Sequence, residues 1–220
     1  LLTTIGAAVA GRSRIALSNA IEPETFAAEI DRYGVTVVSY TWSMLREVIR
    51  ADDLQINRYN PIRLFMGSGM PGGLWNDVTD TFPRARVLEF FATADGSVIL
   101  ANVAGDKPGA MGQSLPGTNH VELAAWDVAN DRLIIDDSGF VRKADAGMPG
   151  LLLSRATHRF DTNGTVLRGV FAPGDRWEVV PQLFVRDVDN DLWLVSALDR
   201  VIHSADGPLF SPPVEYHLSQ

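Results

Sequence analysis

The spacing of the apolar residues changes once along the chain, after Phe91, and this change constrains the fold more than any other feature. Before it, helical spacing such as that of Phe26 and Ile30 alternates with short β-branched runs such as VTVVSY at 35–40. After it, the helical pattern disappears, and turn clusters such as DTNG at 161–164 separate short strand-like runs. The sequence therefore predicts an α/β part followed by a β-rich part.

The boundaries of the expected elements follow from these patterns. The first part is predicted to hold helices over 23–33, 43–50 and 72–82 and strands over 35–40, 62–66 and 86–91. Helical crossovers join these strands, so we expect them to pair in parallel. In the second part we expect strands over 97–102, 120–126, 132–135, 150–155, 177–180, 183–187 and 192–195.

The Gly- and Pro-rich stretch 104–118 is the expected junction between the two parts. It predicts an αβ subdomain over 1–105, a β-rich barrel-like subdomain over 106–200 and a C-terminal tail over 201–220. The apolar run 1–10 has half the ~20 residues that a membrane span needs, and its basic neighbours follow it. We therefore expect a buried segment over 1–17, with neither a membrane anchor nor a secretory signal.

Charge and cysteine content exclude several classes of function. The chain has 27 acidic and 19 basic residues, a formal net charge of −8, and no cysteine. An acidic chain is not expected to bind nucleic acid or an anionic membrane. Without cysteine there are no disulfides, thiolate metal sites or cysteine nucleophiles, and a cytoplasmic location is expected.

A glycine pattern, Gly67-x-Gly69-x-x-Gly72, follows an expected strand and opens an expected helix. Glu89 lies 22 positions after Gly67, near the end of the next strand. This arrangement is typical of dinucleotide-binding folds and favours a nicotinamide or flavin oxidoreductase as one hypothesis. The alternative is a tightly packed turn between a strand and a helix.

Other motifs do not indicate a metal site or a nucleophile. The run Asp187-x-Asp189-Asn190-Asp191 imitates a calcium loop, but Leu192 and Leu198 occupy the positions of its glycine and its bidentate glutamate, so we expect a hairpin turn. The histidines lack the spacing of metal ligands, and no Gly-x-Ser-x-Gly elbow is present. The histidines are His120, His158, His203 and His217.

Several segments, taken in order, resemble those of the adenylate-forming (AMP-binding) enzymes and, among them, the fatty-acyl-CoA synthetases. They are YGVT at 33–36, RLFMGSGMP at 63–71, LEFFATADG at 88–96, KPGAMGQSLPG at 107–117, GLLLSR at 150–155 and WEVVPQLFVRDVDNDLWLVSALDRVI at 177–202. The resemblance implies part of the large-domain fold of those synthetases, an αβ sandwich subdomain followed by a small β-barrel-like subdomain. It assigns the Gly67 turn to packing beside adenine.

That family joins ATP and a carboxylic acid into an acyl-adenylate and passes the acyl group to coenzyme A, with Mg²⁺ on the phosphates. The resemblance thus implies ATP or AMP, Mg²⁺ and coenzyme A as cofactors, and places Asp95 at the Mg²⁺ position. The implied nucleotide-site residues are Gly67, Ser68, Gly69, Phe91, Ala92, Thr93, Asp95 and Gln182.

The polar positions of this implied site depart from the family pattern. Ala94 replaces a phosphate-contacting Thr, and Asp95 is one methylene shorter than the family's Glu. Gln182, preceded by Pro181, replaces the ribose-binding Asp and cannot supply its anionic acceptor, and Ala197 replaces an Arg that helps to hold the nucleotide. Substitutions at separate contacts with one ligand predict a domain that no longer uses ATP and is catalytically inactive, with a binding or structural role.

Two alternatives stay open. The first is a portion of a genuine ATP-dependent ligase, with its phosphate loop upstream of Leu1 and its C-terminal domain beyond Gln220. The second is the dinucleotide-binding oxidoreductase described above.

In the family that the chain resembles, the acyl chain lies against the glycine turn and the strand that follows it, so the resemblance implies an acyl-binding groove lined by apolar residues there. The candidates are Phe65, Met66, Met70 and Phe90. The alternative is that these side chains are ordinary core. The partners that we expect are a fatty acyl group or acyl-CoA, other domains of a longer parent protein, or a second copy of the chain through an exposed apolar patch.

Overall fold

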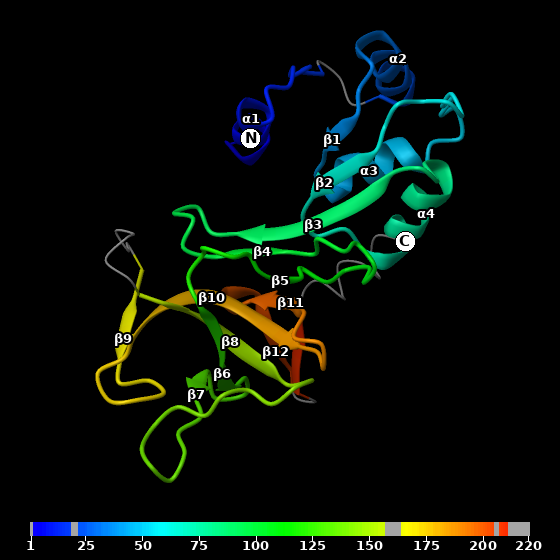
Figure 1. Cartoon of the computed structure of the whole chain (residues 1–220). Coiled ribbons are helices and arrows are strands. Elements are labelled where there is room, and N and C mark those ends of the chain that lie inside the picture. The colour runs from blue at the N-terminus through cyan, green and yellow to red at the C-terminus, as the bar shows by residue number, and fades with distance from the viewer. Residues whose placement is uncertain (1, 19–21, 157–163, 205–206, 211–220) are drawn as a thin grey trace. The chain divides into compact units, whose positions relative to one another are not determined.

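The computed structural model describes residues 2–18, 22–156, 164–204 and 207–210, and it divides into two compact units (Figure 1). Unit 1 comprises Leu1–Glu89 and Ala104–Gly109. Unit 2 comprises Phe90–Val103 and Ala110–Gln220. The architecture is α/β in the first part of the chain and β in the second, as the sequence predicts.

Unit 1 is built from helices and parallel strands. Its described elements are α1 (Leu2–Ala10), α2 (Pro23–Tyr33), β1 (Val37–Ser39), α3 (Trp42–Ile49), β2 (Leu64–Gly67), α4 (Gly72–Thr81) and the first part of β3 (Arg86–Ala92). Helix α2 begins with Pro23 in its first turn, and it ends where Gly34 takes the left-handed conformation at φ 60° and donates its N–H to the Ile30 carbonyl. Both signals are readable in the sequence.

The strands of unit 1 run in parallel in the order β1, β2, β3, with Val38 opposite Phe65 and Phe65 opposite Val87. The predicted parallel pairing is confirmed. Buried side chains from the strands and from α2, α3 and α4 form one core, in which the rings of Phe65 and Phe82 lie 5.0 Å apart. Three strand ends therefore meet at one edge of this sheet.

The N-terminal segment differs from the prediction of a buried segment over 1–17. Residues 2–10 form helix α1, and the side chains of Val9 and Leu17 are 72% and 75% exposed. The cause is that α1 meets the rest of unit 1 through few side chains, among them Thr4, whose hydroxyl donates to the Ser39 hydroxyl at 2.9 Å. An apolar composition indicated burial, but burial also requires a neighbouring surface.

Unit 2 is built from antiparallel strands. Its described elements are the end of β3, β4 (Ile99–Ala101), β5 (Gln113–Ser114), β6 (Val121–Asp127), β7 (Arg132–Leu133), β8 (Pro149–Arg155), β9 (Val166–Arg168), β10 (Arg176–Arg186), β11 (Leu192–Ala197), a 3-10 turn (Leu198–Arg200), β12 (Val201–Ser204) and β13 (Gly207–Phe210). Strands β11, β10, β8, β6 and β7 form a curled sheet in that order, and β9 pairs with β10 (Figure 1).

One long strand replaces two predicted strands in unit 2. The sequence separates 177–180 from 183–187 at Pro181, but both segments belong to β10. The register of β10 against β8 shifts between Val180 and Leu183. Proline has no N–H to donate to a ladder, so a bulge absorbs the interruption without ending the strand.

No helix within the described residues is long and apolar enough to cross a membrane.

Candidate functional site

The glycine turn of unit 1 joins the end of β2 to the start of α4. Gly67 is the last residue of β2 and is buried, Ser68 and Gly69 are exposed, and Met70 returns to the core with 2% exposure. Gly69 has a φ of +81°, a left-handed conformation that side chains with a Cβ rarely adopt. The turn therefore exposes two consecutive residues at the edge where the parallel strands end.

Tyr40, which directly follows β1, packs its ring against the glycine turn. A Cβ added to Gly67 would lie 2.6 Å from Tyr40 Cε2, so only a glycine fits against this ring. The Tyr40 side chain is 7% exposed, and its hydroxyl donates a hydrogen bond to Glu89 Oε1. The Tyr40 ring, just after the neighbouring strand β1, thus explains why the first residue of the motif is a glycine.

Glu89, on β3, is fully buried beneath the turn. Its Oε2 accepts the Gly69 N–H at 2.7 Å, and its Oε1 accepts the Met70 N–H at 3.2 Å in addition to the Tyr40 hydroxyl. Burial raises the pKa of Glu89, and the three hydrogen bonds offset part of that rise. The pKa of Tyr40 is raised by burial and by the Glu89 charge, which keeps its hydroxyl protonated.

This geometry does not favour the oxidoreductase hypothesis. A dinucleotide-binding turn directs its N–H groups at a pyrophosphate, but here the N–H groups of Gly69 and Met70 point at Glu89. The acidic residue of that motif must reach a ribose, whereas Glu89 has no exposed surface. The spacing of the motif is present, but its groups are used for packing within unit 1.

In unit 2, a turn after β3 contains the implied Mg²⁺-binding residue. Asp95 is exposed, and its Oδ1 accepts the Ser97 N–H at 3.1 Å. The Thr93 and Ser97 hydroxyl oxygens lie 3.1 Å apart, and Thr93 Oγ1 accepts the Val98 N–H at 3.0 Å. Partial burial acts to raise the pKa of Asp95, but the hydrogen bonds of Thr93 and Ser97 outweigh it and hold this pKa below its usual value.

Two of the substituted positions lie side by side in unit 2. Gln182 on β10 is directly opposite Ala197 on β11 in the ladder. Phe91 packs edge-on against Phe184, with ring centroids 5.2 Å apart. The two positions at which the resemblance implies nucleotide-holding groups are therefore neighbours on the β10–β11 pair.

Glu178, on β10, is a buried carboxylate that the sequence did not single out. It is 6% exposed, and Oε2 has no hydrogen-bond partner within the described part of the chain. Burial and the charge of Asp95 raise its pKa, and the Gly164 N–H only partly offsets them. This carboxylate costs unit 2 stability when it is ionised.

The predicted acyl-binding residues differ in exposure. Phe65 and Met70 are at most 2% exposed and belong to the core of unit 1, whereas Met66 is half-buried. Phe90 lies in unit 2, half-buried and opposite Ala101. Near the turn in unit 1, Met66 is half-buried and Ser68 and Gly69 are exposed. Ala92 in unit 2 is exposed.

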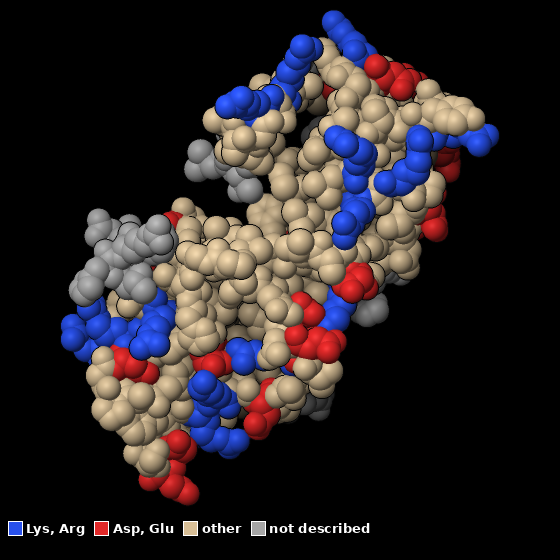
Figure 2. All heavy atoms as spheres, in the orientation of Figure 1, with Lys and Arg blue, Asp and Glu red and all other residues tan. Residues whose placement is uncertain are grey.

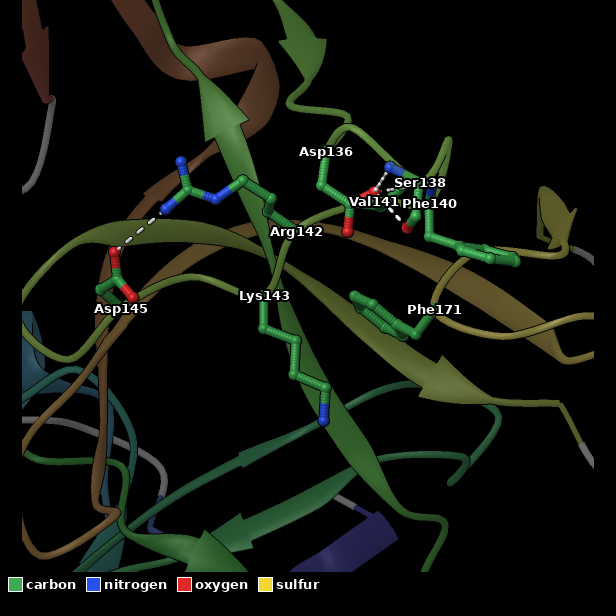
Figure 3. A pocket seen from close by; sticks show the side chains of 8 residues that line it. All are labelled: Asp136, Ser138, Phe140, Val141, Arg142, Lys143, Asp145 and Phe171. Atoms are coloured by element: carbon green, nitrogen blue, oxygen red, sulfur yellow. Dashed lines mark hydrogen bonds and ion pairs between the residues drawn. The ribbon is translucent and has the colours of Figure 1, made fainter.

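A hollow of about 320 Å³ lies elsewhere in unit 2 (Figure 3). Its lining residues are Asp136, Ser138, Phe140, Val141, Arg142, Lys143, Asp145 and Phe171. Each of its charged residues has a partner: Arg142 lies 3.4 Å from Asp145, Lys143 lies 2.7 Å from Glu122, and Asp136 accepts the Ser138 N–H at 2.8 Å. Nothing in it marks a ligand of particular charge.

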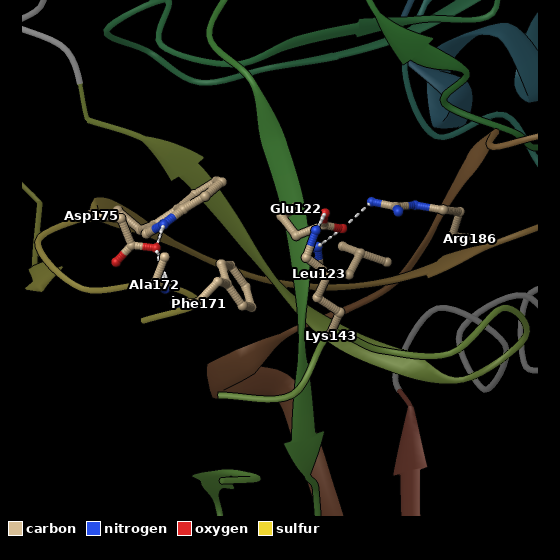
Figure 4. Close-up of polar contacts among 8 residues, drawn as sticks. Glu122, Leu123, Lys143, Phe171, Ala172, Asp175 and Arg186 are labelled. Carbon is tan, nitrogen blue, oxygen red and sulfur yellow. Dashed lines mark hydrogen bonds and ion pairs between the residues drawn. The ribbon is translucent and has the colours of Figure 1, made fainter. Parts of the chain in front are cut away.

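Next to this hollow, Glu122 on β6 is held between two cations (Figure 4). Its carboxylate oxygens lie 2.7 Å from Lys143 Nζ and 2.7 Å from Arg186 Nη2. Burial acts to raise its pKa, but the bonds with Lys143 and Arg186 outweigh this effect and lower it. The ion pair with Arg186 links β6 to β10, and each carboxylate oxygen of Glu122 has a cationic partner.

The described residues do not gather groups suited to a metal ion, and the face drawn in Figure 2 has no large basic patch. Within residues 2–18, 22–156, 164–204 and 207–210, no group of three or more His, Asp or Glu side chains could hold a metal ion. On the face drawn in Figure 2, acidic and basic side chains lie in small interspersed groups between wide uncharged areas.

Comparison with solved structures gives the fold. The chain matches the O-succinylbenzoate coenzyme A synthetase of Bacillus subtilis in complex with AMP over 100% of its own length and 43% of that chain, at 15% identity and a TM-score of 0.68. The chain has the fold of the adenylate-forming CoA ligases. The fold class predicted from the sequence is thereby confirmed.

Curated proteins with similar sequences are named fatty acid transport proteins and a fatty-acid–CoA ligase, and they confirm the resemblance seen in the sequence. Long-chain fatty acid transport protein 2 of Rattus norvegicus is 26% identical over 202 residues, covering 86% of this chain and 32% of that protein. The medium/long-chain-fatty-acid–CoA ligase of Mycobacterium tuberculosis is 26% identical over 186 residues, covering 80% and 30%. No family model matches the chain. The chain spans about a third of the length of these two relatives.

Sequence reasoning missed Tyr40 and did not recognise what Glu89 does in the ligase-like fold. A signal was present for Glu89, because it lies two residues after Val87 on β3, and side chains two residues apart on a strand share one face, here the core-facing one. For Tyr40 the sequence offers only its place at the end of a β-branched run. Its contact with Gly67 depends on the pairing of β1 with β2.

Proposed function

We propose that this chain is an acyl-CoA ligase-like domain that does not catalyse adenylation and instead serves a binding role. The observation that carries the proposal is the placement of Gln182 opposite Ala197, where the resemblance implies an acid and an arginine for the nucleotide. Ala94, in the turn before Asp95, adds the loss of a hydroxyl. The residues present do not fit ATP, and no reaction step is assigned to them.

The magnitude of these losses supports the proposal. A hydrogen bond to a charged group commonly contributes about 1.5–3 kcal/mol. Two or three such losses weaken binding by about two to six orders of magnitude, at ~1.4 kcal/mol per tenfold. MgATP at millimolar concentration is then far from saturating.

A thermal-shift titration with MgATP, paired with a pyrophosphate-release assay on medium- and long-chain fatty acids, tests this function. We expect neither a shift nor release in the wild type. The matched variant restores the family pattern by Gln182→Asp together with Ala197→Arg, and it should gain a MgATP-dependent shift. A shift or pyrophosphate release in the wild type would overturn the proposal and favour a genuine ligase whose other parts lie outside this chain.

For the binding role, we propose a fatty acyl group or acyl-CoA at the glycine turn of unit 1, bound without MgATP. Met66, Ser68 and Gly69 form the accessible surface there. Calorimetric titration of decanoate and decanoyl-CoA tests it against a Ser68→Trp variant. Ser68 is the better position to block, because Gly69 at φ +81° would be strained by any side chain. Binding that is absent, or unchanged in Ser68→Trp, would leave a scaffold role.

We also propose a cytoplasmic location, because the chain has no cysteine and its relatives include a fatty-acid–CoA ligase. Other domains of a longer protein are the proposed partners. A cell-fractionation experiment on the full parent protein tests the location: recovery in the membrane fraction would contradict it.

A further inference from the structure

Three hydrogen-bond donors converge on one buried carboxylate beneath the glycine turn: the Tyr40 hydroxyl and the N–H groups of Gly69 and Met70. We propose that Glu89 and Tyr40 are positioning residues that hold this turn in its ligand-receiving shape and make it prefer uncharged over anionic ligand heads. The inference deepens the acyl-binding role proposed above and rests on it.

The positioning part follows from where the contacts fall. Glu89 holds two consecutive N–H groups of the turn, and the Tyr40 ring contacts the turn at Gly67. The exposed residues Ser68 and Gly69 lie between these attachments, so their backbone is fixed on both sides. A turn that is already ordered loses little conformational entropy when a ligand binds.

The selectivity part follows from charge and from donor geometry. The N–H groups of Gly69 and Met70 are spent on Glu89 and cannot bind an anion from outside. No Lys or Arg forms an ion pair with Glu89 within the described residues. A ligand carboxylate above Ser68 would therefore meet a buried carboxylate that three hydrogen bonds hold but no Lys or Arg pairs with, whereas an ester or an aliphatic chain would bring no charge of its own.

Hydrogen exchange of the Gly69 and Met70 amides, read by NMR at pH 8, tests the positioning role without any ligand. In Glu89→Gln one carboxylate oxygen becomes an NH2 group, which cannot accept a hydrogen bond from these donors. We expect at least one of the two amides to exchange about tenfold faster or more. In Tyr40→Phe both amides keep their acceptor and should exchange more slowly than in Glu89→Gln.

Val78→Ala is the matched control for lost stability. Val78 is 1% exposed, lies on α4 in the same core and makes none of the three bonds. If the Gly69 and Met70 amides exchange no faster in Glu89→Gln than in Val78→Ala, Glu89 is merely structural and the positioning role is overturned.

Calorimetry with decanoate and methyl decanoate at pH 8 tests the selectivity. The wild type should bind methyl decanoate about tenfold more tightly than decanoate, and Glu89→Gln should bring the two affinities together. A wild-type ratio near one, or a ratio that Glu89→Gln leaves unchanged, overturns the selectivity. If the wild type binds neither compound, the acyl-binding role fails, and the amide exchange still decides the positioning role separately.

Discussion

Gly67→Ala is the most direct perturbation of the turn, because the added methyl group has a known neighbour. Its Cβ would lie 2.6, 2.7 and 2.7 Å from Cε2, Cδ2 and Cζ of Tyr40. Carbon atoms in favourable contact are about 3.5–4.0 Å apart, so the ring must move by about 1 Å. The Tyr40 ring is buried and its hydroxyl is bonded to Glu89, so it has little room to move. Overpacking of this kind costs about 1–3 kcal/mol.

Urea unfolding of the wild type and Gly67→Ala measures this loss. Gly72→Ala is the control, since its Cβ would meet nothing within 4 Å and the residue is the first of helix α4. We expect that control to be neutral or to stabilise the protein by up to about 1 kcal/mol. The two substitutions are chemically identical, so a difference between them reports the surroundings of Gly67.

A double-mutant cycle with Tyr40→Leu assigns the loss to the ring. The shorter side chain should remove most of the clash, so that Gly67→Ala costs clearly less in the Tyr40→Leu background. The reasoning is refuted if Gly67→Ala lies within about 0.5 kcal/mol of the wild type. It is also refuted if the cost is the same in both backgrounds, because the strain would then come from the backbone and not from Tyr40.

Three further predictions concern carboxylates of unit 2. Glu178→Gln should stabilise the protein by about 1 kcal/mol at pH 7. Because the pKa of Glu178 is raised, the stability of the wild type relative to this variant should fall as the pH rises above 4.5. Urea unfolding measures this difference, and a relative stability that rises with pH would contradict the prediction. Arg186→Met should lower stability by about 1–3 kcal/mol at pH 7. Because the pKa of Glu122 is lowered, this loss of stability should shrink as acid protonates Glu122, and a loss that stayed the same would count against the ion pair. Asp175→Ala should destabilise the protein by about 1–3 kcal/mol and change the near-UV circular dichroism of Trp177, whose indole N–H donates to Asp175 at 2.8 Å, and an unchanged spectrum would refute that contact.

Much of unit 1 was predictable because its signals are local. The helix over 23–33 has the bounds of α2, since Pro23 and Gly34 mark its ends. The β-branched run at 35–40 contains β1, although the ladder itself covers only Val37–Ser39. Parallel pairing followed from the helices between strands, a rule that needs no knowledge of the partner side chains.

The parts that sequence reasoning missed depend on contacts between distant residues. Pro181 signals an interruption, but whether the strand ends there or forms a bulge depends on whether its pairing with β8 resumes after the proline, as it does from Leu183. Strands β5, β9, β12 and β13 were not predicted, because short strands carry little periodicity of their own. The apolar composition of α1 gave no information about which surface, if any, covers it.

The glycine motif shows most clearly why a pattern and its chemistry can separate. Gly67-x-Gly69-x-x-Gly72 states only that the backbone must turn tightly without side chains, and two different causes impose that demand. In a dinucleotide site the cause is a phosphate approaching the N–H groups from outside. Here it is the Tyr40 ring and the Glu89 carboxylate occupying the inside of the turn. Glu89 has the spacing for both uses, so the direction of the Gly69 and Met70 N–H groups, which no spacing encodes, is what separates the two.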